Sequence, residues 1–192
     1  MGRKTQISKE IILDTALKML IRDGYASVNV TSLAREIGCS TQPIVWHFEH
    51  MEGLRRALFD YSIQYVRDRY HSECRDITDV IDVIAAGTVA LAKEMPNLYQ
   101  YLYMDTQHGV AMKNVMDALK MYDAGEMTAM LAQEYDMTPM QAEMYLLHLE
   151  IYVHGISDYV ATGFSPFSEE FVLDMIRGIS EAFLIQVKSG KI

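Results

Sequence analysis

Apolar residues recur at helical spacing almost throughout the 192-residue chain, and this periodicity constrains the fold more than any other feature. Residues 8–23, for example, place four apolar side chains on one helix face: Ile12, Ala16, Met19 and Leu20. No stretch longer than a few residues alternates between apolar and polar positions, as a half-buried strand does. The sequence therefore predicts an all-α fold.

Capping residues and glycines predict a compact N-terminal head of three helices. Ser8 is suited to cap the first helix, and Gly24 is expected to end it. A short second helix over residues 30–37 closes at Gly38, and Ser40 is expected to cap a third short helix. Two short helices joined by a glycine-containing turn form the general helix-turn-helix pattern, which is common in itself.

Longer helices are expected after the head. A connecting helix begins near Met51 and runs past Arg69. The remaining apolar patterns predict a larger helical body, with helices from Val80 to just before Pro96, Asn97 to Met104, Met112 to Tyr135, Pro139 to Thr162, and Ser168 to about Lys188. The sequence from Thr138 to Gln141 combines a cap, a proline and a glutamine, and it predicts a well-defined helix start.

The charge is distributed unevenly along the chain. The net charge is −9, from 17 lysines and arginines against 26 acidic residues. Residues 1–70 carry ten basic and eight acidic side chains, whereas residues 71–192 carry seven and eighteen. A nearly neutral head on an acidic body can still present one positive face to phosphates. The charge therefore permits binding to nucleic acid without requiring it.

The composition points to a cytoplasmic protein. Two cysteines cannot build a disulfide framework, and the polar N-terminus lacks the apolar core of a signal peptide. The longest nearly apolar run, residues 83–92, is far shorter than the roughly 20 residues of a membrane-spanning helix.

The helix-turn-helix region resembles TetR-type transcriptional regulators over roughly residues 8–58. The resemblance rests on the residues and spacing of Gly24-Tyr25, Val30-Thr31-Ser32-Leu33-Ala34-Arg35-Glu36-Ile37-Gly38-Cys39-Ser40, Ile44-Val45-Trp46-His47-Phe48 and Leu54. It implies a head that binds DNA and a divergent helical body that dimerises and often holds a small effector. We accordingly expect a helix-turn-helix DNA-binding domain over residues 1–50 and a helical regulatory and dimerisation domain over residues 51–192.

By position, the resemblance assigns DNA binding to Arg3, Lys4, Thr31, Ser40, Thr41, Gln42, Pro43, Trp46 and His47. Gln42 is the best candidate to read adenine, because its amide can pair with both N6 and N7. Pro43 and Trp46 are better suited to a thymine methyl or to a sugar. The alternatives are that Trp46 and His47 brace the head against the fourth helix, and that Arg3 and Lys4 belong to a solvated, disordered tail.

The sequence departs from the family at two positions that normally contact phosphate. Val45 stands where a tyrosine is usual, and Met51 stands where a lysine is usual at the start of the fourth helix. Each neutralised phosphate steepens the salt dependence by a slope of about −0.9. We therefore expect a shallower salt dependence than that of a lysine-bearing relative, and a steeper one in Met51→Lys.

The body carries two apolar stripes suited to a four-helix dimer interface, formed by Met144, Leu147, Ile151, Gly155 and Tyr159 together with Ile176, Ile179 and Phe183. The alternative is that both stripes are buried within one chain. Tyrosine and methionine also suit a pocket for a flat or lipophilic effector, and the candidates are Tyr61, Tyr65, Tyr101, Met104, His108, Met112, Met116, Tyr122 and Tyr152. Ordinary core packing is the competing interpretation.

Other functions receive weaker support. His148, Glu150, His154 and Asp158 could be ligands of a metal or acid and base groups of a helical enzyme, but no paired Glu-x-x-His or His-Glu-x-x-His motif is present. No glycine loop for phosphate appears either, so we expect no cofactor, no metal and no enzymatic activity. The second hypothesis is a protein-interaction module that has weakened DNA binding and acts through a protein partner. The first remains a homodimeric repressor that binds a pseudo-palindromic operator.

Overall fold

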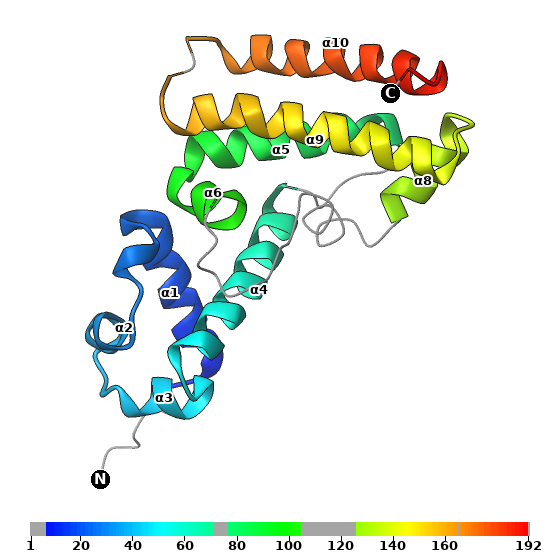
Figure 1. Cartoon of the computed structure of the whole chain (residues 1–192). Helices are drawn as coiled ribbons and strands as arrows, with labels where there is room; N and C mark the ends of the chain where they lie inside the picture. Colours follow the sequence, from blue (N-terminus) through cyan, green and yellow to red (C-terminus); the bar gives the residue numbers. More distant parts are fainter. Residues whose placement is uncertain (1–6, 71–76, 105–125, 165, 192) are drawn as a thin grey trace. The chain divides into compact units, whose positions relative to one another are not determined.

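The structure is a computed structural model that describes residues 7–70, 77–104, 126–164 and 166–191. The described residues are helical and contain no β-strand, which confirms the all-α prediction (Figure 1). In chain order the elements are α1 (Lys9–Asp23), η1 (Tyr25–Ser27), α2 (Val30–Ile37), α3 (Gln42–Phe48), α4 (Met51–Tyr70), α5 (Ile77–Glu94), α6 (Pro96–Tyr103), α8 (Glu126–Glu134), α9 (Pro139–Ala161) and α10 (Glu169–Lys188).

Most of the predicted helix ends are confirmed. The Ser8 side chain accepts a hydrogen bond from the backbone N–H of Ile11 at 3.2 Å, and Gly24 ends α1 at φ 81°. Gly38 ends α2 at φ 76°, in the left-handed region that glycine adopts without strain. Thr138 and Gln141 form the capping box expected at the start of α9.

The predicted cap of the third helix is wrong. The helix begins at Gln42, its N-cap position is Thr41 in helical conformation, and no side chain caps it. Pro43 at the second helical position has no N–H, so one of the amides that a cap would satisfy is missing. Ser40 is therefore left exposed before the helix.

The described residues fall into two compact units. The first comprises Met1–Arg67 and Met95–Val110, and the second comprises Asp68–Glu94 and Ala111–Ile192. In the first unit, α1 packs against η1, α2, α3 and also α6. The division by contacts thus differs from the boundary at residue 50, which concerns function and stays a prediction.

The core of the first unit is built from the faces that the periodicity predicts. Ile12, Ala16 and Leu20 of α1 are fully buried, as are Leu33 of α2 and Ile44 of α3. Within this unit α1, α2 and α3 enclose the core, so α3 is held by its inward face and leaves the opposite face outward.

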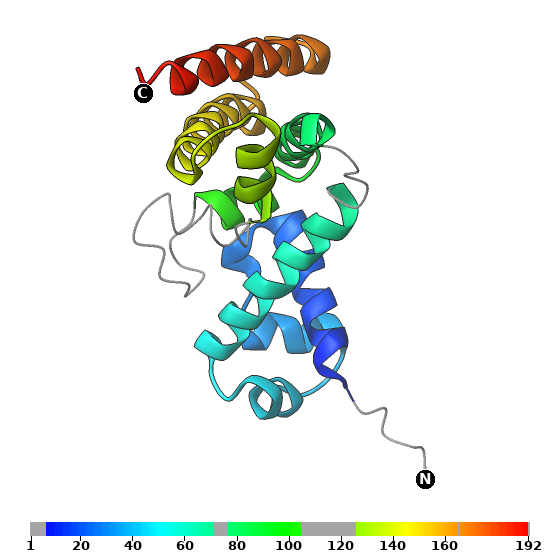
Figure 2. The ribbon, with the colours of Figure 1, turned by 90° about the vertical axis from the view of Figure 1, so that its right-hand side faces the viewer.

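In the second unit α5, α8, α9 and α10 pack together, with α9 contacting each of the other three (Figures 1 and 2). The two last helices lie side by side and antiparallel. Tyr145, Leu149 and Val153 of α9 are buried against Val89 of α5 and Ile176 of α10. Of the predicted helix from Met112 to Tyr135, only α8 lies within the described residues. No helix in the described part of the chain is long and apolar enough to cross a membrane.

Candidate nucleic-acid interface

The outward face of α3 carries the residues predicted to read DNA. Ile44 and Phe48 are buried beneath it, so the side chains between them turn outward. Trp46 is 70% exposed and Val45 is 48% exposed. Thr31, Ser40, Thr41 and Gln42 are exposed as well, and Pro43 is half-buried. The residues predicted for α3 therefore share a surface with the residues just before it.

His47 is tied to the chain that precedes α1. Its Nε2 lies 2.9 Å from the carbonyl oxygen of Ile7, and its ring meets the Trp46 ring edge-on at 4.7 Å between centroids. The contact with Ile7 holds one side of the His47 ring, and DNA binding by His47 stays a prediction. Arg3 and Lys4 lie outside the described residues.

A tight turn joins α3 to α4. Glu49 has φ 62° and ψ −55°, and the backbone N–H of His50 donates to the carbonyl of Phe48 at 2.6 Å. This hydrogen bond and these angles describe a γ-turn of the rare, strained kind. A Cβ at Gly53 would collide with the same Phe48 carbonyl oxygen, so glycine is needed there. This corner was not predicted from the sequence, although Gly53 lies close to the expected helix start.

The start of α2 is held by a side-chain cap that was not predicted from the sequence. The Asn29 side chain accepts from the backbone N–H of Ser32 at 3.0 Å, and the Ser32 hydroxyl lies 3.3 Å from the N–H of Asn29. Arg22 of α1 bonds Glu36 of α2 at 2.9 Å, and its hydrogen bonds to Asp23 and Glu36 raise the pKa of its guanidinium. These contacts fix α2, on which Thr31 is presented.

The two departures from the family pattern differ in placement. Val45 is exposed on α3, whereas Met51, the first residue of α4, is half-buried. Neither side chain can neutralise a phosphate. Their effect on DNA affinity stays a prediction.

The structure distributes the predicted effector residues over both units. Tyr61, Tyr65, Tyr101 and Met104 belong to the first unit, and Tyr152 belongs to the second. Burial, the largest cause, raises the pKa of the half-buried Tyr61. The others, His108, Met112, Met116 and Tyr122, lie outside the described residues. Effector binding by this set therefore stays a prediction.

Tyr101 is a core residue of the first unit. It is 1% exposed, its ring lies 4.8 Å from that of Tyr25, and its hydroxyl donates to the Arg55 carbonyl at 3.4 Å. On the same helix, α6, Asn97 donates to the carbonyl of Ile21 at the end of α1 at 3.1 Å. These contacts make α6 part of the first unit, although it follows α5 in the chain.

The residues predicted for a dimer interface divide into an outward and an inward set. On α9, Ile151 is 57% exposed, Tyr159 is 63% exposed, and Gly155 between them is exposed with open space around it. Met144 and Leu147 of α9 and Ile179 and Phe183 of α10 are half-buried. Ile176 is 1% exposed and belongs to the core of the second unit.

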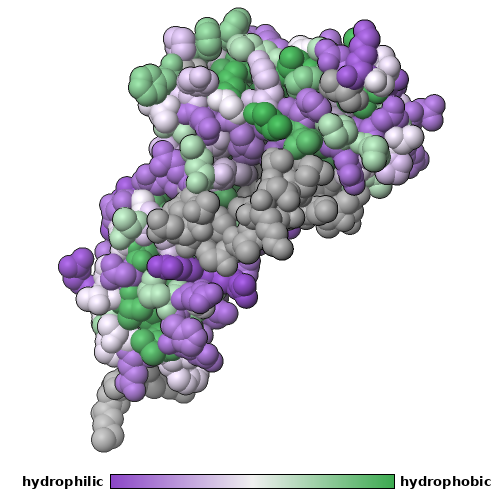
Figure 3. All heavy atoms as spheres, viewed as in Figure 1, coloured by the Kyte–Doolittle hydropathy of each residue, from purple (hydrophilic) through white to green (hydrophobic). Residues whose placement is uncertain are grey.

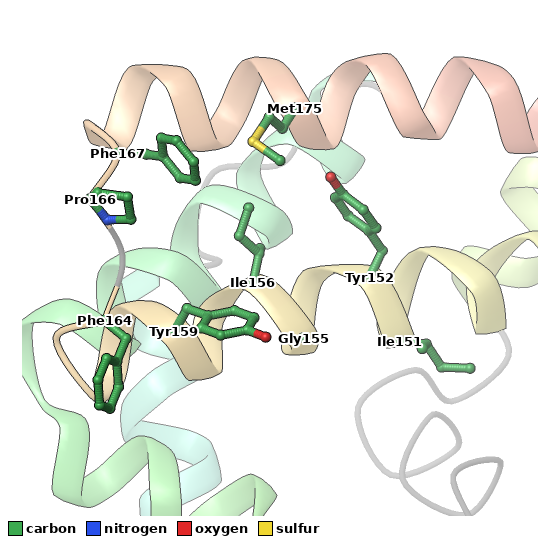
Figure 4. A pocket seen from close by; sticks show the side chains of 9 residues that line it. All are labelled: Ile151, Tyr152, Gly155, Ile156, Tyr159, Phe164, Pro166, Phe167 and Met175. Atoms are coloured by element: carbon green, nitrogen blue, oxygen red, sulfur yellow. The ribbon is translucent and has the colours of Figure 1, made fainter.

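An apolar groove of about 580 Å³ runs along this outward face of α9 (Figure 4). Tyr152 and Ile156 point from α9 toward α10, and Met175 points from α10 toward α9. Phe164 and Phe167, from the segment between the two helices, lie at one end and are 79% and 51% exposed. Figure 3 likewise shows hydrophobic residues at the surface among hydrophilic ones.

The polar cluster on α9 is held by ordinary contacts. Nε2 of His154 lies 2.9 Å from a Glu150 carboxylate oxygen, and Nδ1 of His148 lies 2.7 Å from the Met144 carbonyl. The His148 ring also packs on Phe183. Among the described residues, no group of three or more histidines, cysteines or acidic residues is arranged to hold a metal ion.

Comparisons with known proteins agree with this geometry. The sequence pattern of the bacterial regulatory proteins of the tetR family matches residues 12–58. The fold is similar to a TetR-like transcriptional regulator from Rhodococcus sp. RHA1, with a TM-score of 0.61 and 12% identity over 99% of each chain. No curated protein sequence matches the chain. Residues 12–58, which span the helix-turn-helix region, thus match the bacterial regulatory proteins of the tetR family, and the fold of the whole chain is similar to that of a TetR-like regulator.

Proposed function

We propose that the chain is a homodimeric repressor that acts in the cytoplasm, binds a pseudo-palindromic operator and is released by a small lipophilic or aromatic effector. The observation that carries the proposal is the outward face of α3, where Trp46 is 70% exposed beside the exposed Thr41 and Gln42. A tryptophan left in water on a helix of a tetR-family head is well placed to contact a partner. No enzymatic step is part of this proposal.

The outward face of α3 fits the major groove. A helix in that groove places the side chains of its first turn against base edges. Gln42, the first residue of α3, is proposed to read adenine, and Pro43 and Trp46 to contact thymine methyl groups or sugars. Thr31, Ser40 and Thr41 are proposed to contact the phosphate backbone.

A second copy is proposed to cover the outward face of α9. Ile151, Gly155 and Tyr159 recur every four residues, lie on one side of the helix and are exposed together. The groove beside them is apolar, and monomeric proteins rarely leave such surfaces open. Two-fold pairing there would match half-sites about 34 to 36 Å apart on DNA.

Release by an effector requires that it favour a body conformation in which the heads no longer fit the operator. Tyr61 and Tyr65 of α4 are proposed to transmit that preference, because they are half-buried on the helix that joins the two units in sequence. The functional division into residues 1–50 and 51–192 belongs to the same proposal. Replacing both tyrosines should change the coupling between effector and operator.

The first experiment is fluorescence anisotropy with the DNA directly upstream of the chain's own gene, at two salt concentrations and with unrelated competitor DNA. We expect tight binding that resists the competitor. Trp46→Ala should weaken it by roughly tenfold, the scale of losing one base contact, while Gln64→Ala on the exposed side of α4 should not. Binding that never discriminates among sequences would count against an operator-binding repressor.

One observation favours the second candidate, a protein-interaction module. Val45 is 48% exposed next to Trp46, so α3 presents an apolar pair where the family usually has a phosphate contact. That function predicts no specific operator at moderate salt, together with a reproducible heteromeric partner in a pull-down. Loss of the partner in Val45→Ser would support it.

A further inference from the structure

The DNA-facing end of the head has an unusual charge composition. From Glu36 to Leu54 the sequence contains no lysine or arginine. This stretch includes α3 and the α3–α4 corner, and the only groups in it that can become positive are the imidazoles of His47 and His50. Because phosphate contacts dominate DNA affinity, the source of positive charge here needs an explanation.

The geometry of His47 leaves one ring nitrogen for a phosphate. A carbonyl oxygen only accepts hydrogen bonds, so the contact with Ile7 requires that Nε2 carry the hydrogen. Nδ1 is then the nitrogen that gains a proton and becomes a second donor. No other hydrogen bond of this ring involves the described residues. The ring is thus fixed from one side and able to bind an anion from the other.

His50 is exposed, and its backbone is fixed at the α3–α4 corner. Its N–H closes the γ-turn on Phe48, and its carbonyl accepts from the N–H of Leu54 at 3.2 Å in the first turn of α4. Gly53 allows this close approach. The backbone of His50 is therefore held in a defined position, three residues after His47 and beyond the end of α3.

Several charged side chains surround the two imidazoles, and protonation of the imidazoles changes the local charge. Glu49 and Glu52 flank His50 and are exposed, Arg55 and Arg56 follow in α4, and Lys9 of α1 lies over the Phe48 ring at 5.5 Å. When both imidazoles are neutral, every charged side chain in residues 36–54 is negative. Two added protons would offset the charges of Glu49 and Glu52 next to the proposed DNA surface.

We propose that His47 and His50 bind backbone phosphates of DNA as imidazolium ions, so that DNA binding takes up protons. This inference rests on the proposed DNA-binding function and adds phosphate contacts by His47 and His50 to it. A neighbouring phosphate favours the charged form of an imidazole, so phosphate binding and proton uptake favour each other. Affinity then rises as the pH falls and weakens as the pH rises.

The test measures anisotropy of a fluorescent mixed-sequence duplex of about 30 base pairs over a salt series, at pH about 6 and about 8. For the full-length protein, the slope of log affinity against log salt should be steeper at the lower pH by up to about 0.9 per imidazolium. Affinity at about 0.1 M salt should rise on the order of tenfold. No pH effect on the wild type would overturn the proposal.

Glutamine variants separate the imidazoles from other titrating groups. His47→Gln with His50→Gln should bind with the same slope at both pH values, because glutamine can donate a hydrogen bond to Ile7 but takes up no proton. His50→Gln alone, at an exposed site, should remove about half of the pH effect and provides a variant whose folding is not at risk. His154→Gln in the second unit is the matched control and should keep the wild-type pH effect.

The outcomes distinguish this inference from the proposed function. Binding with a pH effect that persists unchanged in the double variant overturns the histidine contacts and leaves the repressor proposal intact. Failure of the wild type to bind the duplex or the upstream DNA at either pH overturns the DNA-binding proposal itself.

Discussion

The two units of this chain treat their apolar residues differently. In the first unit the buried residues of α1, α2 and α3 form one core, and the exposed surface around α3 is mainly polar, apart from Val45 and Trp46. In the second unit the face of α9 opposite the core remains apolar, with Ile151 and Tyr159 more than half exposed. The head thus buries most of its apolar residues within its own core, whereas the body leaves an apolar face of α9 exposed.

Glycines show the same difference. In the head, Gly53 lies so close to the Phe48 carbonyl that no side chain fits. In the body, Gly155 and Gly178 lie in the middle of α9 and α10 with open space around them. A glycine within a helix costs roughly 0.5 to 1 kcal/mol of stability relative to alanine. No contact among the described residues requires glycine at Gly155 or Gly178, because a Cβ there would meet open space. In the head, by contrast, Gly53 is required by the close approach of the Phe48 carbonyl at the α3–α4 corner.

The largest effect is expected from emptying the head's core. Ile44→Ala removes a fully buried side chain from α3 and should lower the unfolding free energy by about 2 to 5 kcal/mol. Denaturant unfolding followed by circular dichroism would measure it. Ile11→Ala, 42% exposed on α1, is the matched control, and a similar loss there would contradict the difference in burial.

Replacing Gly53 at the α3–α4 corner by a residue with a side chain should have the next largest effect on stability. Gly53→Ala forces the Phe48 carbonyl to shift, which should cost about 1 to 3 kcal/mol and weaken DNA binding, because α3 turns relative to α4. Gly178→Ala should instead stabilise the body by up to about 1 kcal/mol. Thermal melts of both variants would compare the two changes in stability. A stabilising effect of both substitutions would show that the corner is not constrained.

The open face of the body is tested by truncating its centre. Ile151→Ala should weaken the proposed dimer on the order of tenfold, since central apolar contacts contribute about 1 kcal/mol or more from each copy. Sedimentation over a concentration series would detect the shift toward the 21.9 kDa monomer. Ile185→Ala, 68% exposed on α10 and outside the predicted interface, is the control. If the wild-type protein is monomeric at micromolar concentration, the proposed dimer is wrong.

The smallest effect concerns a surface ion pair in the second unit. Arg69 bonds the Glu94 carboxylate at 3.0 Å, and this hydrogen bond is the main cause that lowers the pKa of Glu94. A lowered pKa stabilises the fold at pH values above the ordinary one, and that contribution is lost as the pH falls through the lowered value. Glu94→Gln should therefore cost less than about 1 kcal/mol near neutral pH and nothing in acid. Melts at both pH values would check it, and a cost that persists in acid would point to the Tyr70 hydroxyl instead.

Local sequence signals were sufficient for most of the helix ends of the head. Gly24 and Gly38 end their helices because each adopts a positive φ, and Ser8 caps α1 through its own side chain. The cap predicted at Ser40 failed because Pro43 removes an amide that the cap would bond. Each of these outcomes depends on residues within one turn of the helix end.

The candidate DNA surface could be predicted only in part. The buried pair of Ile44 and Phe48 follows from helical periodicity, and it forces Trp46 outward. The strained turn at Glu49 could not be predicted, because a non-glycine residue has no local preference for a positive φ and adopts it only where the surrounding structure imposes it. The position of His50 depends on that turn.

The sequence alone determined the all-α fold, most of the helix ends and the match of residues 12–58 to the tetR family, because these depend on periodicity and on residues close together in the chain. Only the tertiary structure decided that α6 belongs to the first unit, since Asn97 contacts Ile21 across 76 positions and no local pattern encodes that partner. The tertiary structure also decided which face of α9 is buried in the core and which face is exposed. The physical reason is that a helix shows in its sequence which side is apolar, while the choice of what covers that side is made by other parts of the molecule.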